Sequence, residues 1–184
     1  VDSSTIPGNF CGSPSLIDAI PFSGTGDTGV ATNDFQVGEA VCQTGSTLAK
    51  GAASDDHVWL FHPQQAGTYT ITLTPESGFD SALYVVTDCP NANASCLAVD
   101  DQFTNPEEVL VNLDAGEAAY IVVDGWSNTD NLTGTYTLTV SEPCAPACEG
   151  KQCGEDGCGA FCGFCAPGDL CDEQGACLPA TDLP

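Results

Sequence analysis

The sequence predicts an all-β protein: an antiparallel β-sandwich followed by a small disulfide-knotted C-terminal module. Two observations predict this fold class. Between residues 15 and 140, apolar and polar residues alternate with the period of two that is typical of half-buried strands, and turn formers separate the alternating runs. After residue 140 the alternation stops and cysteines crowd the chain. We therefore expect two domains, residues 1–140 and residues 141–184.

Strands are expected wherever alternation or a short apolar run is bounded by turn formers. In TYTITL, residues 68–73, apolar side chains share one face and threonines the other, and GTYTLTV, residues 134–140, repeats this arrangement. The remaining expected strands are 57–62, 81–86, 95–99, 107–113, 118–123 and, more weakly marked, 15–22. No segment shows a long amphipathic helical pattern, so the strands must pack against one another as two sheets.

The C-terminal module begins at SEPCAP, residues 141–146, where two prolines end the last strand. It has too few apolar residues for a core of its own, so covalent cross-links must hold it. Its cysteines are Cys144, Cys148, Cys153, Cys158, Cys162, Cys165, Cys171 and Cys177.

The chain is strongly acidic, with 26 aspartates and glutamates against two lysines, and its net charge is -24. Such a surface repels phosphate backbones and anionic lipids, so we expect no nucleic-acid partner. No apolar run reaches the length of a membrane span, so we expect no membrane insertion. The high, even number of cysteines is typical of an oxidising compartment. We expect a secreted protein, extracellular or at the cell surface, from which a signal peptide has been removed.

Several stretches resemble the bacterial pre-peptidase C-terminal domain family. They are DDHVWLFHPQQAGTYTITL (55–73), FDSALYVVTDC (79–89), LAVDDQF (97–103) and AGEAAYIVVDG (115–125). CGEDGCGAFCGFC, residues 153–165, resembles a CGxDGCGxxCGxC module of secreted myxobacterial proteins. The resemblance implies a jelly-roll-like sandwich that is secreted, usually non-catalytic, and involved in export, adhesion or substrate attachment.

Four cysteines lie in the sandwich. Cys89 and Cys96 bracket PNANAS between two strands expected to form a hairpin, so we predict a local bridge there. Cys11 and Cys42 are then left to pair, which on the loop-entropy model contributes about 3–4 kcal/mol. The pairing within the tail stays open, because eight cysteines allow many connectivities.

The CxxC formed by Cys162 and Cys165 has three interpretations. Zinc usually takes two such pairs, whereas the tail has one CxxC and no histidine. A redox pair normally opens a helix that lowers a thiol pKa, whereas this CxxC lies among glycines. We therefore expect structural disulfides.

No catalytic motif stands out. His57 and His62 lie five residues apart on one expected strand, so they point to opposite faces and cannot hold a metal together. Neither GxSxG nor HExxH occurs. We expect that the protein is not an enzyme and requires no cofactor.

Aspartates at strand ends offer the oxygen ligands that calcium prefers. The first candidate calcium cluster, expected at one end of the sandwich, comprises Asp80, Asp100, Asp101 and Asp124. The second comprises Asp34, Asp55 and Asp56. The competing interpretation is that these aspartates only form turns, where Asp-Gly and Asp-Asp are common.

Four further residues are candidates for surface roles. Asn93 and Asn131 match the glycosylation sequon. Trp126 and Phe103, in expected loops, either bind a ligand or cover the core.

Two non-catalytic functions compete. Dense cross-linking and few sites for a trypsin-like protease favour a self-assembling subunit of a bacterial extracellular filament, surface layer or matrix, in which sheet edges pair. The alternative, which the family resemblance favours, is a glycan- or protein-binding module for targeting or adhesion. Copies that each carry a charge of -24 repel one another, so assembly would need cations, salt or large apolar contacts.

Overall fold

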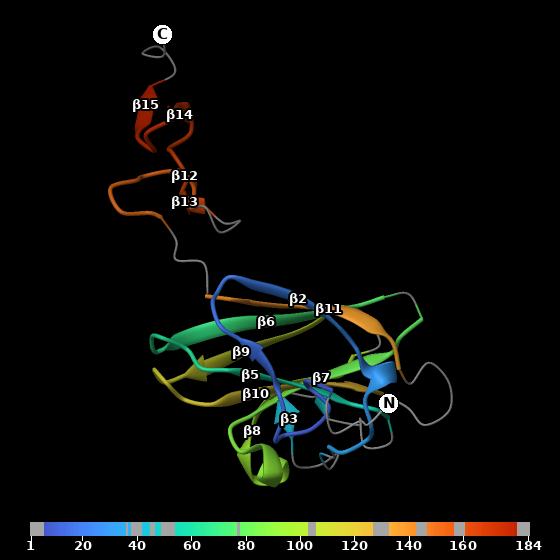
Figure 1. The fold of residues 1–184 in the computed structure, drawn as a ribbon. Helices are drawn as coiled ribbons and strands as arrows, with labels where there is room; N and C mark the ends of the chain where they lie inside the picture. The colour runs from blue at the N-terminus through green and yellow to red at the C-terminus, as the bar shows by residue number, and fades with distance from the viewer. Residues whose placement is uncertain are drawn as a thin grey trace. The chain divides into compact units, whose positions relative to one another are not determined.

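The protein is described by a computed structural model. It describes residues 6–35, 37, 42–44, 47–48, 54–76, 78–102, 106–126, 133–142, 147–156 and 161–179. The chain divides into two compact units, Val1–Glu142 and Pro143–Pro184. The boundary expected from the sequence lies two residues earlier, after residue 140. The first unit is the sandwich, and the second is called here the knotted module (Figure 1).

Two sheets form the two layers of the sandwich, as predicted (Figure 1). In the five-stranded sheet the order is β1 (Ser15–Ile17), β5 (His57–Phe61), β10 (Ala119–Gly125), β7 (Ser81–Val86) and β8 (Cys96–Asp100). In the four-stranded sheet it is β2 (Phe22–Asp27), β11 (Thr135–Ser141), β6 (Gly67–Pro75) and β9 (Glu107–Leu113). Neighbouring strands in these sheets are antiparallel except β1 and β5, which are parallel.

The short elements are η2 (Thr28–Val30), η3 (Cys89–Asn91), α1 (Ala92–Ser95) and a small hairpin of β3 (Gln43–Thr44) and β4 (Thr47–Leu48). The single strand predicted for residues 15–22 is wrong. The chain leaves the five-stranded sheet after β1 and enters the four-stranded sheet at β2. Pro21, just before β2, has no N–H to donate to a ladder and so suits the crossing between sheets.

The main hydrophobic core fills the space between the sheets. The alternation read from the sequence is observed: Tyr69, Ile71 and Leu73 of β6 are buried there, and the threonines between them are more exposed. Leu138 on β11 is buried in the same way. Each such side chain contributes about 1.5–3 kcal/mol through burial.

The outer face of the five-stranded sheet is buried as well. Every residue of β7 is buried, so neither face of this strand is exposed to solvent. Phe35 and Val37 belong to a second hydrophobic cluster with Tyr84 and Val122, and the rings of Phe35 and Tyr84 stack with centroids 5.5 Å apart. The described residues Cys11, Phe35, Val37 and Cys42 thus cover this face, and they are called here the outer layer.

Two disulfides fasten the outer layer to the sheet. They join Cys11 to Cys89 and Cys42 to Cys96, with Cα–Cα distances of 5.7 and 5.4 Å. The predicted pairing, Cys89 with Cys96 and Cys11 with Cys42, is therefore wrong. Residues of η3 and α1 lie between Cys89 and Cys96 in the chain. All four cysteines belong to the second hydrophobic cluster, where Cys11 contacts Cys89 and Cys42 contacts Cys96.

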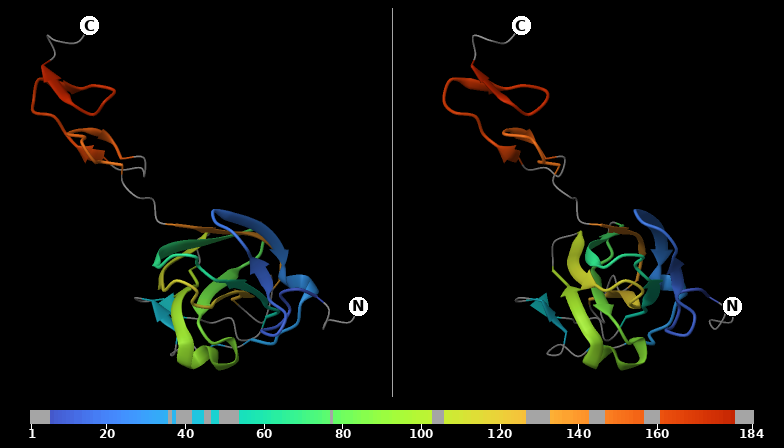
Figure 2. Two further views of the ribbon diagram at one scale, coloured as in Figure 1. Left: turned by 60° about the vertical axis from the view of Figure 1, so that its left-hand side comes forward. Right: turned by 90° about the vertical axis from the view of Figure 1, so that its left-hand side faces the viewer.

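The knotted module contains two small hairpins (Figure 2). One pairs β12 (Gly154–Glu155) with β13 (Phe161–Gly163), and the other pairs β14 (Asp169–Cys171) with β15 (Cys177–Pro179). Its described disulfides are Cys148–Cys162, Cys153–Cys171 and Cys165–Cys177, while Cys144 and Cys158 lie outside the described residues. Among the described apolar side chains of this module, that of Cys153 alone is fully buried.

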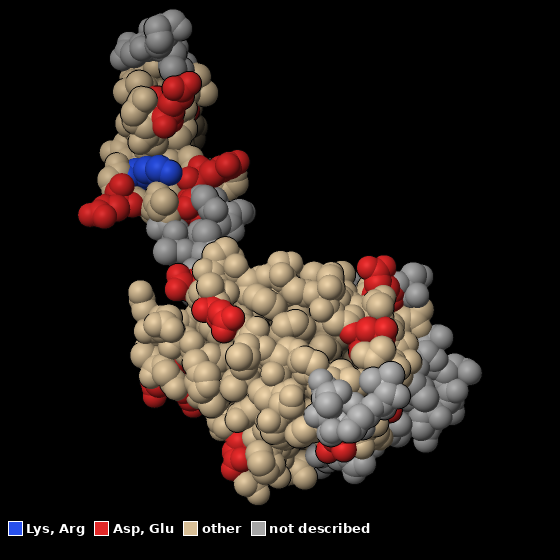
Figure 3. Space-filling view, viewed as in Figure 1, with Lys and Arg blue, Asp and Glu red and all other residues tan. Residues whose placement is uncertain are grey.

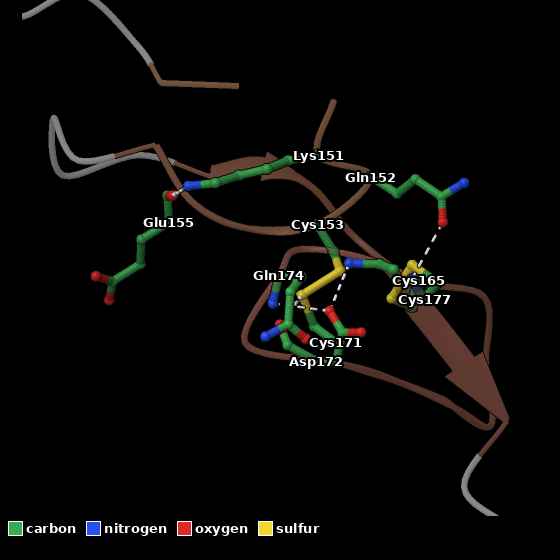
Figure 4. The surroundings of a disulfide bond; sticks show 10 residues. Lys151, Gln152, Cys153, Glu155, Cys165, Cys171, Asp172, Gln174 and Cys177 are labelled. Atoms are coloured by element: carbon green, nitrogen blue, oxygen red, sulfur yellow. Dashed lines mark hydrogen bonds between the residues drawn. A yellow bond between two sulfur atoms is a disulfide. The ribbon is translucent and has the colours of Figure 1, made fainter. Parts of the chain in front are cut away.

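The disulfides Cys153–Cys171 and Cys165–Cys177 lie close together in the module (Figure 4). The sulfurs of Cys153, Cys165 and Cys171 lie within 4.8 Å of one another, a spacing that free thiolates could use to hold a metal. All three sulfurs are bonded in disulfides, so none of them is a free thiolate. Both cysteines of the CxxC are bridged to other parts of the module, so this motif is structural here. Nearby, Asp172 accepts hydrogen bonds from the backbone N–H groups of Gln174 and Ala176, at 3.0 and 2.7 Å, and so shapes the turn between β14 and β15.

Candidate functional site

The grouping of the acidic residues differs from the one expected from the sequence, because these residues lie on two different faces of the five-stranded sheet. The register of β5 with β10 places Asp56 and Asp124 at adjoining positions on the outer face. Asp100 lies opposite Leu83, a residue of the main core, and so faces inward. Asp124 therefore belongs with Asp56, and these two are called here the outer carboxylate pair.

Asp56 is fully buried and fastens the outer layer. Its Oδ2 accepts hydrogen bonds from the backbone N–H groups of Asp34 and Phe35, at 2.9 and 2.8 Å. Its Oδ1 is buried without a hydrogen-bond partner in the described part of the chain. Burial raises the pKa of Asp56 to about 7; the two N–H bonds oppose this rise, and the charges of Asp34 and Asp55 add to it.

Asp124 is also fully buried. It accepts a hydrogen bond from the hydroxyl of Tyr84 and a second, of 2.7 Å, from the backbone N–H of Gly125. Burial raises the pKa of Asp124 well above its ordinary value, although the Tyr84 bond lowers it, and the charges of Asp56 and Asp101 raise it further. Two buried carboxyl groups thus lie on one face of the sheet, close enough for the charge of Asp56 to raise the pKa of Asp124.

A second buried group lies on the inner face at the end of the sandwich. Glu107 of β9, fully buried, accepts a hydrogen bond of 3.1 Å at Oε2 from the backbone N–H of Gln102. The Gln102 amide donates to Asp100 at 2.9 Å, and Asp100 also accepts from the N–H of Glu108 at 2.8 Å. Asp100 and Glu107 are called here the inner carboxylate pair. Burial raises the pKa of Glu107 to about 8; the Gln102 N–H opposes this, and the Asp100 charge adds to it.

Sequence reasoning missed Glu107 as a site residue, although a signal was present. In EEVLVNL, the alternation that points Val109 and Val111 inward also points Glu107 inward. Its Oε1 and the Oγ of Ser81, both buried, have no hydrogen-bond partner in the described structure. Ser81 shares the inner face of β7 with Leu83 and so lies at the same end as the inner carboxylate pair.

The predicted calcium clusters are not sets of three adjacent carboxylates. Among the described residues, no three acidic side chains bring their oxygens within 4.8 Å of one another. Asp80 and Asp101 lie near the inner carboxylate pair, where their charges raise the pKa of Glu107. Asp34 and Asp55 lie near Asp56.

The buried carboxylates have no cationic side chain beside them in the described sandwich. The lysines of the chain are Lys50, outside the described residues, and Lys151, in the knotted module. Burying an ionised carboxylate without an opposite charge costs several kcal/mol. That cost is relieved either by taking up protons or by binding a cation that prefers oxygen ligands.

A third polar network crosses the core between the two sheets. Trp59 Nε1 donates to the Tyr136 hydroxyl at 2.8 Å, this hydroxyl lies 2.7 Å from His57 Nδ1, and His57 Nε2 lies 3.0 Å from Ser15 Oγ. Burial lowers the pKa of His57 to about 4, so the imidazole is neutral over the ordinary pH range. Such a Ser–His contact raises the question of nucleophilic catalysis.

The direction of the hydrogen bonds opposes that use. The indole N–H can only donate, so the Tyr136 oxygen accepts a hydrogen bond from it. We assign the tyrosine hydroxyl as the donor of the hydrogen bond to His57 Nδ1. The imidazole proton then sits on Nε2 and points at Ser15, a tautomer assigned from this network. A general base must instead present an unprotonated nitrogen to the serine. The network is therefore built to stabilise the core.

The remaining candidates are dispersed. Asn93 is exposed on α1, beside a cavity of about 400 Å³ that Asp34 and Phe35 also line. Trp126 is exposed just after β10, and its backbone N–H donates to the carbonyl of Asp80 at 2.9 Å. Asn131 and Phe103 lie outside the described residues. In the described part of the chain, no helix has the length and apolar character that crossing a membrane requires.

No family model and no curated protein matches this chain. Among solved structures, the sandwich is similar to the pre-peptidase C-terminal domain of collagenase from Bacillus anthracis, at a TM-score of 0.42 and 19% identity over 69% of this chain and 93% of that chain. A family 35 carbohydrate binding module from an environmental isolate is also similar, at a TM-score of 0.34 and 21% identity over 67% of this chain and 88% of that chain.

Proposed function

We propose that this chain is a non-catalytic binding module of a secreted protein, and that calcium stabilises its sandwich. One observation carries the calcium proposal. Two carboxylate oxygens, Asp56 Oδ1 and Glu107 Oε1, are fully buried without a hydrogen-bond partner in the described structure, and no described cationic side chain of the sandwich offsets their charge. Five described disulfides support secretion.

The donor chemistry fits calcium, which takes oxygen ligands from carboxylates, hydroxyls, carbonyls and water. The outer carboxylate pair would supply Asp56 and Asp124, and the inner pair Asp100 and Glu107, with hydroxyls, backbone carbonyls or water completing either site. Binding at Asp56 would strengthen its hold on the outer layer, because its Oδ2 already anchors the backbone of Asp34 and Phe35.

Thermal unfolding in calcium and in chelator tests this proposal. A ligand that binds only the folded state stabilises it by about 2.7 kcal/mol at a hundred times its Kd, so millimolar calcium should raise Tm by several degrees. Asp56→Asn and Glu107→Gln should each reduce the calcium-dependent rise. Asp18→Asn, an exposed aspartate, is the matched control and should keep it. An unchanged wild-type Tm in calcium would refute calcium binding.

A binding role is favoured over assembly by charge. Each copy carries -24, and a module that binds a different partner need not bring two such charges together. Sedimentation of the native protein in calcium and in chelator should give a species near 18.8 kDa in both. Large regular particles would establish a self-assembling subunit instead.

A further inference from the structure

We propose that Phe161 and Phe164 of the knotted module form a binding surface for a basic protein segment. Phe161 is 56% exposed and Phe164 is 83% exposed. Their ring centroids lie 5.4 Å apart, with the ring planes inclined by 33°, so the two side chains form one continuous aromatic surface. This inference rests on the proposed role as a binding module and names the chemistry of its partner.

The exposure of these two rings contrasts with the phenylalanines of the sandwich core, while Phe10 and Phe22 are half-buried. Phe35, Phe61 and Phe79 in the sandwich are buried, with exposed fractions of 3–4%. Large aromatic side chains that lie together on a surface are typical of binding sites, where aromatic residues supply much of the affinity. Phe161 and Phe164 of the knotted module are therefore far more exposed than the core phenylalanines of the sandwich.

The backbone under the two rings is held rigidly. Phe161 precedes Cys162, which is bridged to Cys148, and Phe164 precedes Cys165, which is bridged to Cys177. Between them, Gly163 lies so close to the chain that a Cβ there would be 2.5 Å from a backbone carbonyl oxygen. A surface held in this way loses little conformational entropy when a partner binds.

The surroundings of the aromatic surface favour a cation. Glu155 lies directly opposite Phe161 in the β12–β13 ladder. The described part of the module has one lysine, Lys151, whose Nζ donates a hydrogen bond of 3.1 Å to the backbone carbonyl of Glu155 and leaves the Glu155 carboxylate exposed. The cationic side chain lies among acidic ones in Figure 3. The acidic residues that are exposed or half-buried are Glu149, Glu155, Asp169, Asp172 and Glu173.

An arginine or lysine of a partner fits both features. Its guanidinium or ammonium group would lie over a phenylalanine ring in a cation–π contact and would form an ion pair with the Glu155 carboxylate. A neutral glycan would gain nothing from the acidic field, and a second copy of this chain would be repelled by its charge of -24. The observations thus favour a basic peptide segment over both.

The test measures binding of a labelled peptide of alternating arginine and glycine to the full, oxidised chain at an ionic strength of about 0.15 M. Replacing both rings, Phe161→Ser with Phe164→Ser, should weaken binding about tenfold, and Glu155→Gln should weaken it about threefold. Leu170→Ser is the matched control, because Leu170 is 51% exposed in the same module, and it should bind like the wild type. Peptide mapping without reduction verifies that every variant keeps the native bridges.

Other outcomes would overturn the inference. Absence of wild-type binding would refute the basic peptide as the partner. Equal binding by the double phenylalanine variant would leave only general adsorption to an acidic surface. Ring-dependent binding of the neutral sugar cellohexaose without peptide binding would make the surface a glycan site, and the proposed binding function would stand. A ring-dependent dimer in sedimentation would identify a second copy as the occupant and would count against both proposals.

Discussion

The sandwich and the knotted module solve the problem of stability in different ways. The sandwich has two hydrophobic clusters, one on each side of its five-stranded sheet, and buries tyrosines, phenylalanines and even carboxylates. The knotted module, a segment of about 40 residues, has one fully buried apolar side chain among those described and leaves its aromatic rings in solvent. The comparison shows that covalent bonds can replace a core and so leave apolar side chains exposed to solvent.

Reduction of the disulfides should have the largest effect, and it should affect the two units most differently. The described bridges of the knotted module span 12–18 residues and contribute about 3 kcal/mol each on the loop-entropy model, with no core to replace them. In reductant, two-dimensional amide NMR should show collapsed signals for the module and dispersed signals for the sandwich. Dispersed module signals after complete reduction would contradict this account.

The pH dependence of stability should come from the sandwich. Between the unfolded and folded pKa values of Asp56, Glu107 and Asp124, the folded state binds more protons, so stability falls as pH rises. His57 acts in the opposite direction between about pH 4 and 6.5, because its folded pKa is lowered. We expect a net fall on the order of 4 kcal/mol in chelator from pH 4 to 8, measured by chemical denaturation.

Two variants sharpen the pH prediction. Glu107→Gln should flatten the curve, most clearly between about pH 6.5 and 8, where His57 no longer titrates. Leu170→Ser in the knotted module changes no titratable group and should leave the slope unchanged. Stability that rises steadily from pH 4 to 8 in chelator would show that the buried carboxylates do not carry the effect.

Matched leucine truncations compare the two units directly. Leu138→Ala, in the main core, should lower the free energy of unfolding by about 3 kcal/mol. Leu170→Ala, half-exposed on β14, should change it by less than about 0.5 kcal/mol. The first value comes from denaturant titration followed by tryptophan fluorescence. The second comes from amide NMR signals of the module, because every tryptophan and tyrosine lies in the sandwich. Similar costs at the two positions would refute the contrast.

The smallest expected effect concerns the network across the core. Tyr136→Phe removes the hydroxyl that links Trp59 to His57 and leaves two buried nitrogen groups unpaired, at a cost of about 1–2 kcal/mol. His57 loses its proton donor at Nδ1, so its resonances should also reveal the other tautomer in NMR. An unchanged stability and tautomer would show that the assigned direction of the hydrogen bonds is wrong.

Much of the sandwich could be predicted because strand patterns are local. In TYTITL the side chains that alternate along the chain also alternate between core and solvent, and that relation needs no knowledge of other segments. The single strand expected at residues 15–22 failed for the same reason. The transfer of the chain from one sheet to the other leaves little mark on so short a stretch.

The sequence by itself determined the all-β class of this protein and the structural use of its CxxC, because alternation and cysteine density act within short segments. Only the tertiary structure decided which cysteines of the sandwich pair, that Asp124 joins Asp56, and that Glu107 is buried. It also decided that Phe161 and Phe164 meet as one exposed surface. These features depend on an outer layer, a strand register and a network of bridges that join distant segments, and local patterns carry no information about such contacts.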